Sequence, residues 1–209
     1  MSITNKDNEG KLLNILGIMG SGRKNSNSGN LMRHSLDSIN DSYNCRTESI
    51  LLGDYRLEAC KGCEQCNRTG VCVIKDDMNE LYDKVSDADI IIFASPVYFY
   101  GVPGHSKIFI DRFQPYWAKK YLLKDIPPQK RTGGLIGVAG SKGSKVFDCL
   151  FLPVKYMFDT LNADIFPSLF FRNWDNQPSD LTDEMIEKAK FFGTEIVNYH
   201  NEHILKSEQ

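Results

Sequence analysis

The sequence predicts an α/β protein built on a doubly wound parallel sheet, with helices on both faces. Short apolar runs alternate with segments of helical periodicity five times along the 209 residues, and no internal repeat is visible. Alternation of this kind is typical of a parallel sheet covered by helices. The runs are continuous and rich in β-branched residues, as expected for strands that are buried on both faces.

Each apolar run is expected to form one strand, over residues 11–19, 45–52, 89–96, 134–140 and 163–171. Helical periodicity predicts helices within residues 31–39, 75–88, 106–113, 141–161 and 181–200. Ser28 or Asn30 can cap the first helix, Asp76 the second and Thr182 the last. Residues 115–133 carry no clear pattern and are expected to form a long connection.

Five strand–helix units in a chain of this length fit the flavodoxin-like strand order 2-1-3-4-5. Residues 1–10 are polar and are expected to be a flexible N-terminus, followed by a single domain over residues 11–209. Ligands of such sheets bind at the carboxyl ends of the strands. Three loops are expected at that edge, over residues 20–30, 96–104 and 140–145.

Composition narrows the classes of partner. The chain is 41% hydrophobic and 25% charged, with a net charge of −2, so nothing indicates a nucleic-acid partner. The N-terminal residues lack the apolar core of a signal peptide, and no apolar run approaches the roughly 20 residues that span a bilayer. We therefore expect a cytoplasmic protein without a membrane partner, in which thiols stay reduced.

The first loop, within GIMGSGRKNSNS (17–28), combines glycine with hydroxyl and amide side chains. It departs from the Walker A pattern at Arg23 and Lys24, and from the dinucleotide fingerprint at Asn25. Ser, Asn and Arg donors before a helix N-terminus favour an anion such as a monophosphate. The alternative is a solvated loop that only caps a helix.

The second loop, beginning SPVYFY (95–100), places three aromatic rings just past the central strand. Aromatic rings in that position can stack on a flat heterocycle. The alternative is that these rings are simply part of the core or of an interface.

Four cysteines lie within thirteen residues, CKGCEQCNRTGVC (60–72). The spacing C-x2-C-x2-C is the one by which a short chain surrounds an iron–sulfur cubane, and Gly70 allows the chain to turn back so that Cys72 is the fourth ligand. A zinc site and free or redox-active thiols remain open as alternatives. Cys45 and Cys149 are expected to be small buried hydrophobic residues.

Three segments together resemble one protein family, over about residues 12–145. GSGRKNSNSGNL resembles the phosphate loop of the NAD(P)H-dependent FMN reductase-like flavoproteins, and FASPVYFYGVPGHSKIFIDRF resembles their second flavin loop. CKGCEQCNRTGVCVIKDDM resembles the cysteine motif of the iron–sulfur flavoprotein branch. Ser28 stands where threonine is usual in the family and keeps the hydroxyl.

The resemblance implies FMN at the strand ends and a [4Fe–4S] cluster on the cysteines. The implied phosphate ligands are Ser21, Arg23, Ser26, Asn27 and Ser28. The implied isoalloxazine contacts are Pro96, Val97, Tyr98, Phe99 and Gly101, with a third wall at Ala139, Gly140 and Gly143. The implied cluster ligands are Cys60, Cys63, Cys66 and Cys72.

The function expected from this resemblance is that of an FMN-dependent oxidoreductase that relays electrons between the cluster and FMN. Ferredoxin or NAD(P)H would be the donor and a small molecule the acceptor. Because such relatives are oligomers, a homodimer or homotetramer is expected, in which a neighbouring subunit could supply the flavin. The alternatives are an NAD(P)H-dependent FMN or quinone reductase without a cluster, and a flavin-binding module without activity. Electron or hydride transfer to FMN needs no general acid or base, so no catalytic residue is assigned.

Overall fold

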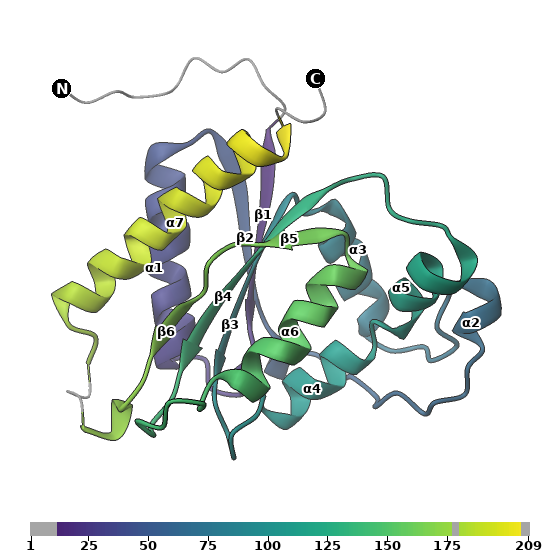
Figure 1. Ribbon diagram of the computed structural model, residues 1–209, viewed down its shortest axis with the longest axis horizontal. Coiled ribbons are helices and arrows are strands. Elements are labelled where there is room, and N and C mark those ends of the chain that lie inside the picture. Colours follow the sequence, from purple (N-terminus) through teal and green to yellow (C-terminus); the bar gives the residue numbers. More distant parts are fainter. Residues whose placement is uncertain (1–11, 177–179, 206–209) are drawn as a thin grey trace.

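The computed structural model describes residues 12–176 and 180–205. The expected flexible N-terminus, residues 1–10, lies outside this range. Within the described residues, parallel strands form one sheet in the order β2-β1-β3-β4-β5, with β6 also paired to β4, which confirms the predicted strand order (Figure 1). The strands are β1 (Leu13–Met19), β2 (Cys45–Leu51), β3 (Ile90–Pro96), β4 (Arg131–Val138), β5 (Ala163–Ile165) and β6 (Leu169–Phe171).

Helices cover both faces of the sheet (Figure 1). One face carries α1 (Asn27–Ser42) and α7 (Asp183–His203). The other carries α3 (Met78–Asp87), α4 (Gly104–Asp111) and α6 (Asp148–Thr160). Shorter elements are η1 (Leu52–Asp54), α2 (Cys66–Thr69), α5 (Gln114–Ala118), the π-helical turn η2 (Lys119–Leu123) and η3 (Trp174–Asn176).

The two-sided burial explains why the strands are continuous apolar runs. Along β1, Ile15 and Met19 pack in the core beneath α1 and α7, whereas Leu16 and Ile18 pack in the core beneath α3, α4 and α6. Successive side chains of a strand point to opposite faces, so both sets must be apolar. The same alternation places helices on both sides of every central strand.

Helix α1 begins earlier than the sequence analysis expected. Its N-cap is Ser26, which has an extended backbone and whose Oγ accepts the N–H of Gly29 at 3.2 Å. The expected caps Ser28 and Asn30 both lie inside the helix, so that prediction was wrong. Several hydroxyl residues in a row offer equivalent caps, and the backbone conformation selects among them. Consequently Asn27 and Ser28 form the first turn of α1. The cap of α7 at Thr182 is confirmed, because its Oγ1 accepts the N–H of Met185 at 3.3 Å.

Two other segments differ from expectation. The fifth strand, predicted over residues 163–171, is divided into β5 and β6 around Pro167, which has no N–H to donate to a sheet. Residues 115–133, expected to be a connection, contain α5, η2 and the start of β4. Short helices of this kind lack the length over which helical periodicity becomes visible in a sequence.

Helices α1 and α7 approach each other closely through small residues. Ser35 Oγ donates to the carbonyl of Ala189 at 2.7 Å, and Ser38 Oγ donates to the carbonyl of Lys190 at 2.9 Å. A Cβ built on Gly193 would lie 2.3 Å from the carbonyl oxygen of Ser35. The clash would be with backbone, which cannot rotate away as a side chain could.

We expect Gly193→Ala to destabilise the protein by about 1–3 kcal/mol, the usual cost of overpacking. This loss exceeds the gain of about 1 kcal/mol that alanine brings to a helix interior. Denaturant unfolding of the FMN-free protein measures the difference. Gly104→Ala is the matched control, because a Cβ there meets no described atom within 4 Å. Equal stability of the two variants would contradict the close approach.

Candidate functional site

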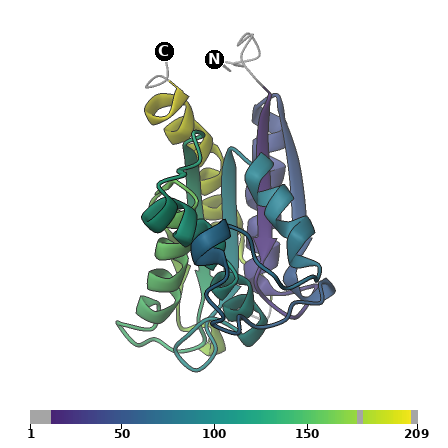
Figure 2. The ribbon, with the colours of Figure 1, turned by 90° about the vertical axis from the view of Figure 1, so that its right-hand side faces the viewer.

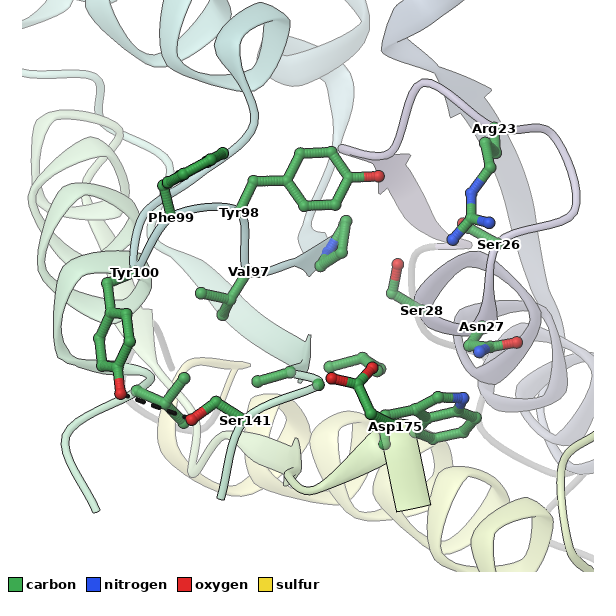
Figure 3. Close-up of a pocket in the computed structure, with 16 residues that line it drawn as sticks. Arg23, Ser26, Asn27, Ser28, Val97, Tyr98, Phe99, Tyr100, Ser141 and Asp175 are labelled. Carbon is green, nitrogen blue, oxygen red and sulfur yellow. Dashed lines mark hydrogen bonds between the residues drawn. The ribbon is translucent and has the colours of Figure 1, made fainter. Parts of the chain in front are cut away.

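A cleft of about 460 Å³ lies at the carboxyl ends of β1, β3 and β4 (Figure 3). This volume is within the usual range for small-molecule sites. Its walls come from the loop before α1, the loop after β3, the loop after β4 and the turn η3. The lining residues are Arg23, Ser26, Asn27, Ser28, Pro96, Val97, Tyr98, Phe99, Tyr100, Val138, Ala139, Gly140, Ser141, Val146, Trp174 and Asp175.

The first wall is the N-terminus of α1. The first turn of a helix has backbone N–H groups without helical partners and carries the positive end of the dipole. Ser28 Oγ is buried and has no hydrogen-bond partner among the described residues. Arg33 supports the loop from behind, since its Nη2 donates to the carbonyl of Lys24 at 2.6 Å. This wall therefore offers donors to an anion.

The loop is fixed against the sheet at Gly20. Its N–H donates to the carbonyl of Ala94 at 2.8 Å, which continues the β1–β3 ladder by one residue. Its carbonyl accepts from Ser106 Oγ at 2.6 Å. A Cβ on Gly20 would lie 2.6 Å from that Oγ, so only glycine allows this approach.

The second wall is a tight hairpin. Tyr98 and Gly101 exchange both backbone hydrogen bonds at 2.9 Å, and between them Phe99 and Tyr100 have positive φ values of 48° and 60°. Bulky residues seldom adopt this conformation, and it concentrates at functional sites. Val97 N–H donates to the carbonyl of Val138 at 2.8 Å, which fixes the hairpin to the neighbouring strand.

The third wall joins the loop after β4 to η3. Tyr100 and Ser141 hydroxyls lie 3.4 Å apart across the edge of the cleft (Figure 3). Trp174 N–H donates to the carbonyl of Ala139 at 3.0 Å. A Cβ on Gly140 would lie 2.5 Å from the carboxylate of Asp175, so glycine at this position admits that carboxylate.

Most of the residues that the sequence analysis assigned to the flavin line this cleft, but three do not. Ser21 is buried, and its Oγ accepts the N–H of Arg23 at 3.1 Å. Gly101 closes the hairpin, and a Cβ on Gly143 would lie 2.7 Å from the Tyr100 hydroxyl. Tyr100, one of the three aromatic rings expected in the second loop, also lines the cleft. The lining residues that the sequence analysis missed are Val138, Ser141, Val146, Trp174 and Asp175. Trp174 and Asp175 follow the last strand, so the rule that ligands bind at carboxyl ends could have found them.

The four cysteines of the 60–72 segment line a second cavity, also of about 460 Å³. The segment leaves the carboxyl end of β2 and lies outside the helices of that face, where α2 contacts α5 and η2 (Figure 2). Gly62, Glu64 and Gly70 have positive φ values of 62°, 59° and 66°, which turn the chain repeatedly. Ile74, Pro115 and Trp117 supply apolar walls.

All six cysteines lie in the described part of the chain, and none of them forms a disulfide. Burial raises the pKa of Cys66, and the charges of Cys72, Cys60 and Cys63 raise it further. The four cysteines of the segment line one cavity, but no three Cys, His, Asp or Glu side chains in the described part of the chain are gathered around a single ion position. Cys45 is half-buried against the core beneath α1 and α7, so its expected burial is met in part. Cys149 is exposed, so its expected burial was wrong. Cys149 lies on the solvent side of α6, next to the buried Leu150.

Arg112 closes the cysteine segment from the end of α4. Its guanidinium pairs with Asp76, with Nη1 to Oδ2 at 2.6 Å, and both side chains are almost completely buried. Burial alone would raise the pKa of Asp76, but hydrogen bonds from Arg112 and from backbone N–H groups hold it below its usual value. Arg112 also lines the cysteine cavity. The two cavities have no described lining residue in common. The loops of the cleft and the cysteine segment nevertheless all follow the carboxyl ends of strands.

No helix within residues 12–176 and 180–205 combines the length and the apolar character needed to cross a bilayer.

The chain matches the family model for NADPH-dependent FMN reductase over residues 13–154. An iron–sulfur flavoprotein of Archaeoglobus fulgidus is 31% identical over 186 residues, which is 88% of this chain and 79% of that protein. An iron–sulfur flavoprotein of Methanocaldococcus jannaschii is 36% identical over 130 residues, which is 62% of this chain and slightly under two thirds, 64%, of that protein.

Solved structures share the fold at lower identity. A flavone reductase aligns with a TM-score of 0.70 and 20% identity, covering 92% of this chain and 65% of that one. An NAD(P)H:quinone oxidoreductase of Methanothermobacter marburgensis aligns with a TM-score of 0.67 and 13% identity, covering 88% and 95%. Together with the strand order, these likenesses establish a flavodoxin-like fold. The chain belongs to the NADPH-dependent FMN reductase family, in its iron–sulfur flavoprotein branch.

Proposed function

We propose that this protein is an electron-transfer flavoprotein that relays electrons between a [4Fe–4S] cluster and FMN. The observation that carries the proposal is the second cavity, where four thiols from one short segment face a common space. Thiolates are the ligands that hold such clusters. The iron–sulfur flavoproteins to which the chain is similar support the same assignment. The ligands would be Cys60, Cys63, Cys66 and Cys72.

The FMN phosphate would lie at the N-terminus of α1. Ser28 Oγ is a buried donor without a described partner, and a phosphate oxygen would satisfy it. The first-turn N–H groups and the nearby Arg23 add positive potential without a metal. The proposed phosphate residues are Ser26, Asn27, Ser28 and Arg23, with Ser21 acting through the conformation of the loop.

The isoalloxazine ring would lie between the hairpin after β3 and the loop after β4. Bound FMN supplies a group that accepts either a hydride or single electrons. The proposed contacts are Pro96, Val97, Tyr98, Phe99, Ala139 and Gly140, with Gly101 and Gly143 shaping the two loops. The hairpin orients the ring and excludes water from one side. The donor would be ferredoxin or NAD(P)H and the acceptor a small molecule.

A second subunit would bring a flavin near the cysteine cavity. Trp117, Leu152 and Tyr156 form an apolar surface beside that cavity and are 38%, 49% and 64% exposed. Trp117 also lines the cysteine cavity itself. Exposed apolar patches of this kind mark interaction sites. Because the cleft and the cysteine cavity share no described residue, we propose a homodimer or homotetramer that uses this surface.

One alternative is an NAD(P)H-dependent FMN or quinone reductase whose cysteines hold no cluster. The family description, NADPH-dependent FMN reductase, is the observation that favours it. Under this alternative NADPH bleaches the bound flavin rapidly and anaerobically purified protein contains no iron.

Ser28→Ala tests the phosphate site. We expect FMN affinity to fall about 10- to 100-fold, since a hydrogen bond to a charged group contributes about 1.5–3 kcal/mol. The FMN-free protein should keep its stability, because the lost hydroxyl has no described partner. Fluorescence titration of FMN and denaturant unfolding measure the two quantities. Ser42→Ala, at the other end of α1, is the matched control. Unchanged FMN affinity in Ser28→Ala would refute the assignment.

Cys63→Ser tests the cluster. Wild-type protein purified without oxygen should contain iron and acid-labile sulfide in near-equal amounts, with broad absorption in the blue. Cys63→Ser should lose most of both and keep FMN, because its side chain belongs to the second cavity and not to the cleft. Cys149→Ser, on an exposed position of α6, is the control and should keep the cluster. Yellow wild-type protein without iron would favour the reductase alternative.

Tyr156→Lys tests the subunit interface. A lysine on the apolar surface should shift the protein toward the monomer, because burying an unpaired ammonium is costly. Size-exclusion chromatography with light scattering gives the mass. Phe191→Lys is the control, since Phe191 is 66% exposed on α7 and outside this surface. A wild-type monomer at micromolar concentration would argue against the interface.

A further inference from the structure

The two ends of the cysteine segment are held together by one buried arginine. Arg112 Nη1 donates to the carbonyl of Glu58 at 2.7 Å, and Nη1 and Nη2 donate to the two carboxylate oxygens of Asp76 at 2.6 and 3.0 Å. Asp76 also accepts the N–H of Glu58 at 2.7 Å. Glu58 precedes the first cysteine and Asp76 follows the last. The ion pair therefore closes the base of the loop that carries all four thiols.

Stability alone does not account for this pair. The Arg112 and Asp76 side chains are 0% and 7% exposed, so both charges have lost their hydration. Replacing such a pair with neutral groups is often neutral or even stabilising. A buried ion pair that adds little to stability is expected to serve another purpose, either through its charge or through the N–H donors of Arg112.

One donor of Arg112 is left over. The Nε–H is buried and has no hydrogen-bond partner among the described residues, while both terminal nitrogens are engaged. An unsatisfied buried donor is costly, and more so on a charged group. Arg112 lines the cysteine cavity. The cavity is also lined by the four cysteines, by apolar side chains and by polar ones such as Asn67 and Gln114, none of which accepts the Nε–H.

We propose that Arg112 is a positioning residue for the iron–sulfur site: its terminal nitrogens set the spacing of the loop ends, and its Nε–H donates a hydrogen bond to a sulfur of the bound cluster. This inference rests on the cluster proposed above. Hydrogen bonds to the sulfurs and the charge around a cluster set its reduction potential. The Asp76 carboxylate largely offsets the charge of the guanidinium, so the effect comes mainly from the Nε–H donor, which stabilises the more negative, reduced form of the cluster. Arg112 therefore raises the potential of the cluster relative to that of FMN.

The test compares reduction potentials in protein that carries both groups. Arg112→Met combined with Asp76→Asn removes both charges together, so neither is left buried and unpaired, and the asparagine oxygen can still accept a backbone N–H. We expect its cluster potential to fall by at least about 59 mV, which is a tenfold change for one electron. The FMN potential should not change. Anaerobic redox titration followed by EPR for the cluster and by absorbance for FMN gives both values.

Two further variants separate positioning from general damage. Arg112→Lys keeps the charge and should recover part of the potential. Arg131→Met removes another buried arginine, which donates to the carbonyls of Ala88 and Leu161 at 3.1 and 3.0 Å at the start of β4. Arg131→Met should leave the cluster potential unchanged, whatever its effect on unfolding.

The outcomes distinguish a failure of the role of Arg112 from a failure of the proposed function. A cluster-containing double variant with wild-type potential overturns the role of Arg112 and leaves the proposed function intact. A double variant that keeps its fold and FMN but loses iron supports the positioning of the loop, provided Arg131→Met keeps its iron. Loss of iron in both variants overturns the specific role. Wild-type protein that holds no iron overturns the proposed function and this inference with it.

Discussion

The hydrogen bond from Gly20 to Ala94 governs the arrangement of the cleft. It extends the parallel pairing of β1 with β3 by one residue and brings the loop before α1 beside the loop after β3. Ser106 holds the carbonyl of the same glycine from α4, so the backbone passes between two elements that leave no room for a Cβ. From this point Ser26 starts α1, and its first turn faces the aromatic hairpin. Parallel pairing thus gives the site its position, and the local chemistry of each loop gives it its selectivity.

Much of the fold could be predicted from the sequence, because strands that are buried on both faces are continuous apolar runs. Ile90 to Ala94 alternate between two cores, which fixes both the strand and the expectation of helices on either side. Other features depend on choices that the sequence leaves open. Ser26, Ser28 and Asn30 are all good caps, and only the backbone conformation distinguishes them. Asp175 lies more than thirty residues beyond the loop it contacts, and its place beside Gly140 follows from β6 pairing with β4.

The cysteine segment shows the limit of arguing from topology. Its position after β2 correctly places its origin at the carboxyl edge, but the turns at Gly62, Glu64 and Gly70 carry the thiols outward onto α5 and η2. The pairing of Arg112 with Asp76 joins residues 36 positions apart. Neither the outward path nor the buried ion pair has a signature in the spacing of the cysteines. The motif indicates which cysteines are the proposed ligands, whereas the surrounding helices determine what their side chains face.

The hairpin at Phe99 and Tyr100 has a consequence for how this protein can change. Glycine or asparagine would adopt those backbone angles at lower energy, so the aromatic pair lowers the stability of the folded chain. Stability therefore favours other residues at these two positions, whereas the aromatic edge of the cleft depends on the two rings that are present. A substitution there that relieves the backbone strain is compatible with the fold while it changes the aromatic edge of the cleft. The hairpin can accept other residues at these two positions, whereas Gly20 in the neighbouring loop cannot be replaced without a clash at its Cβ.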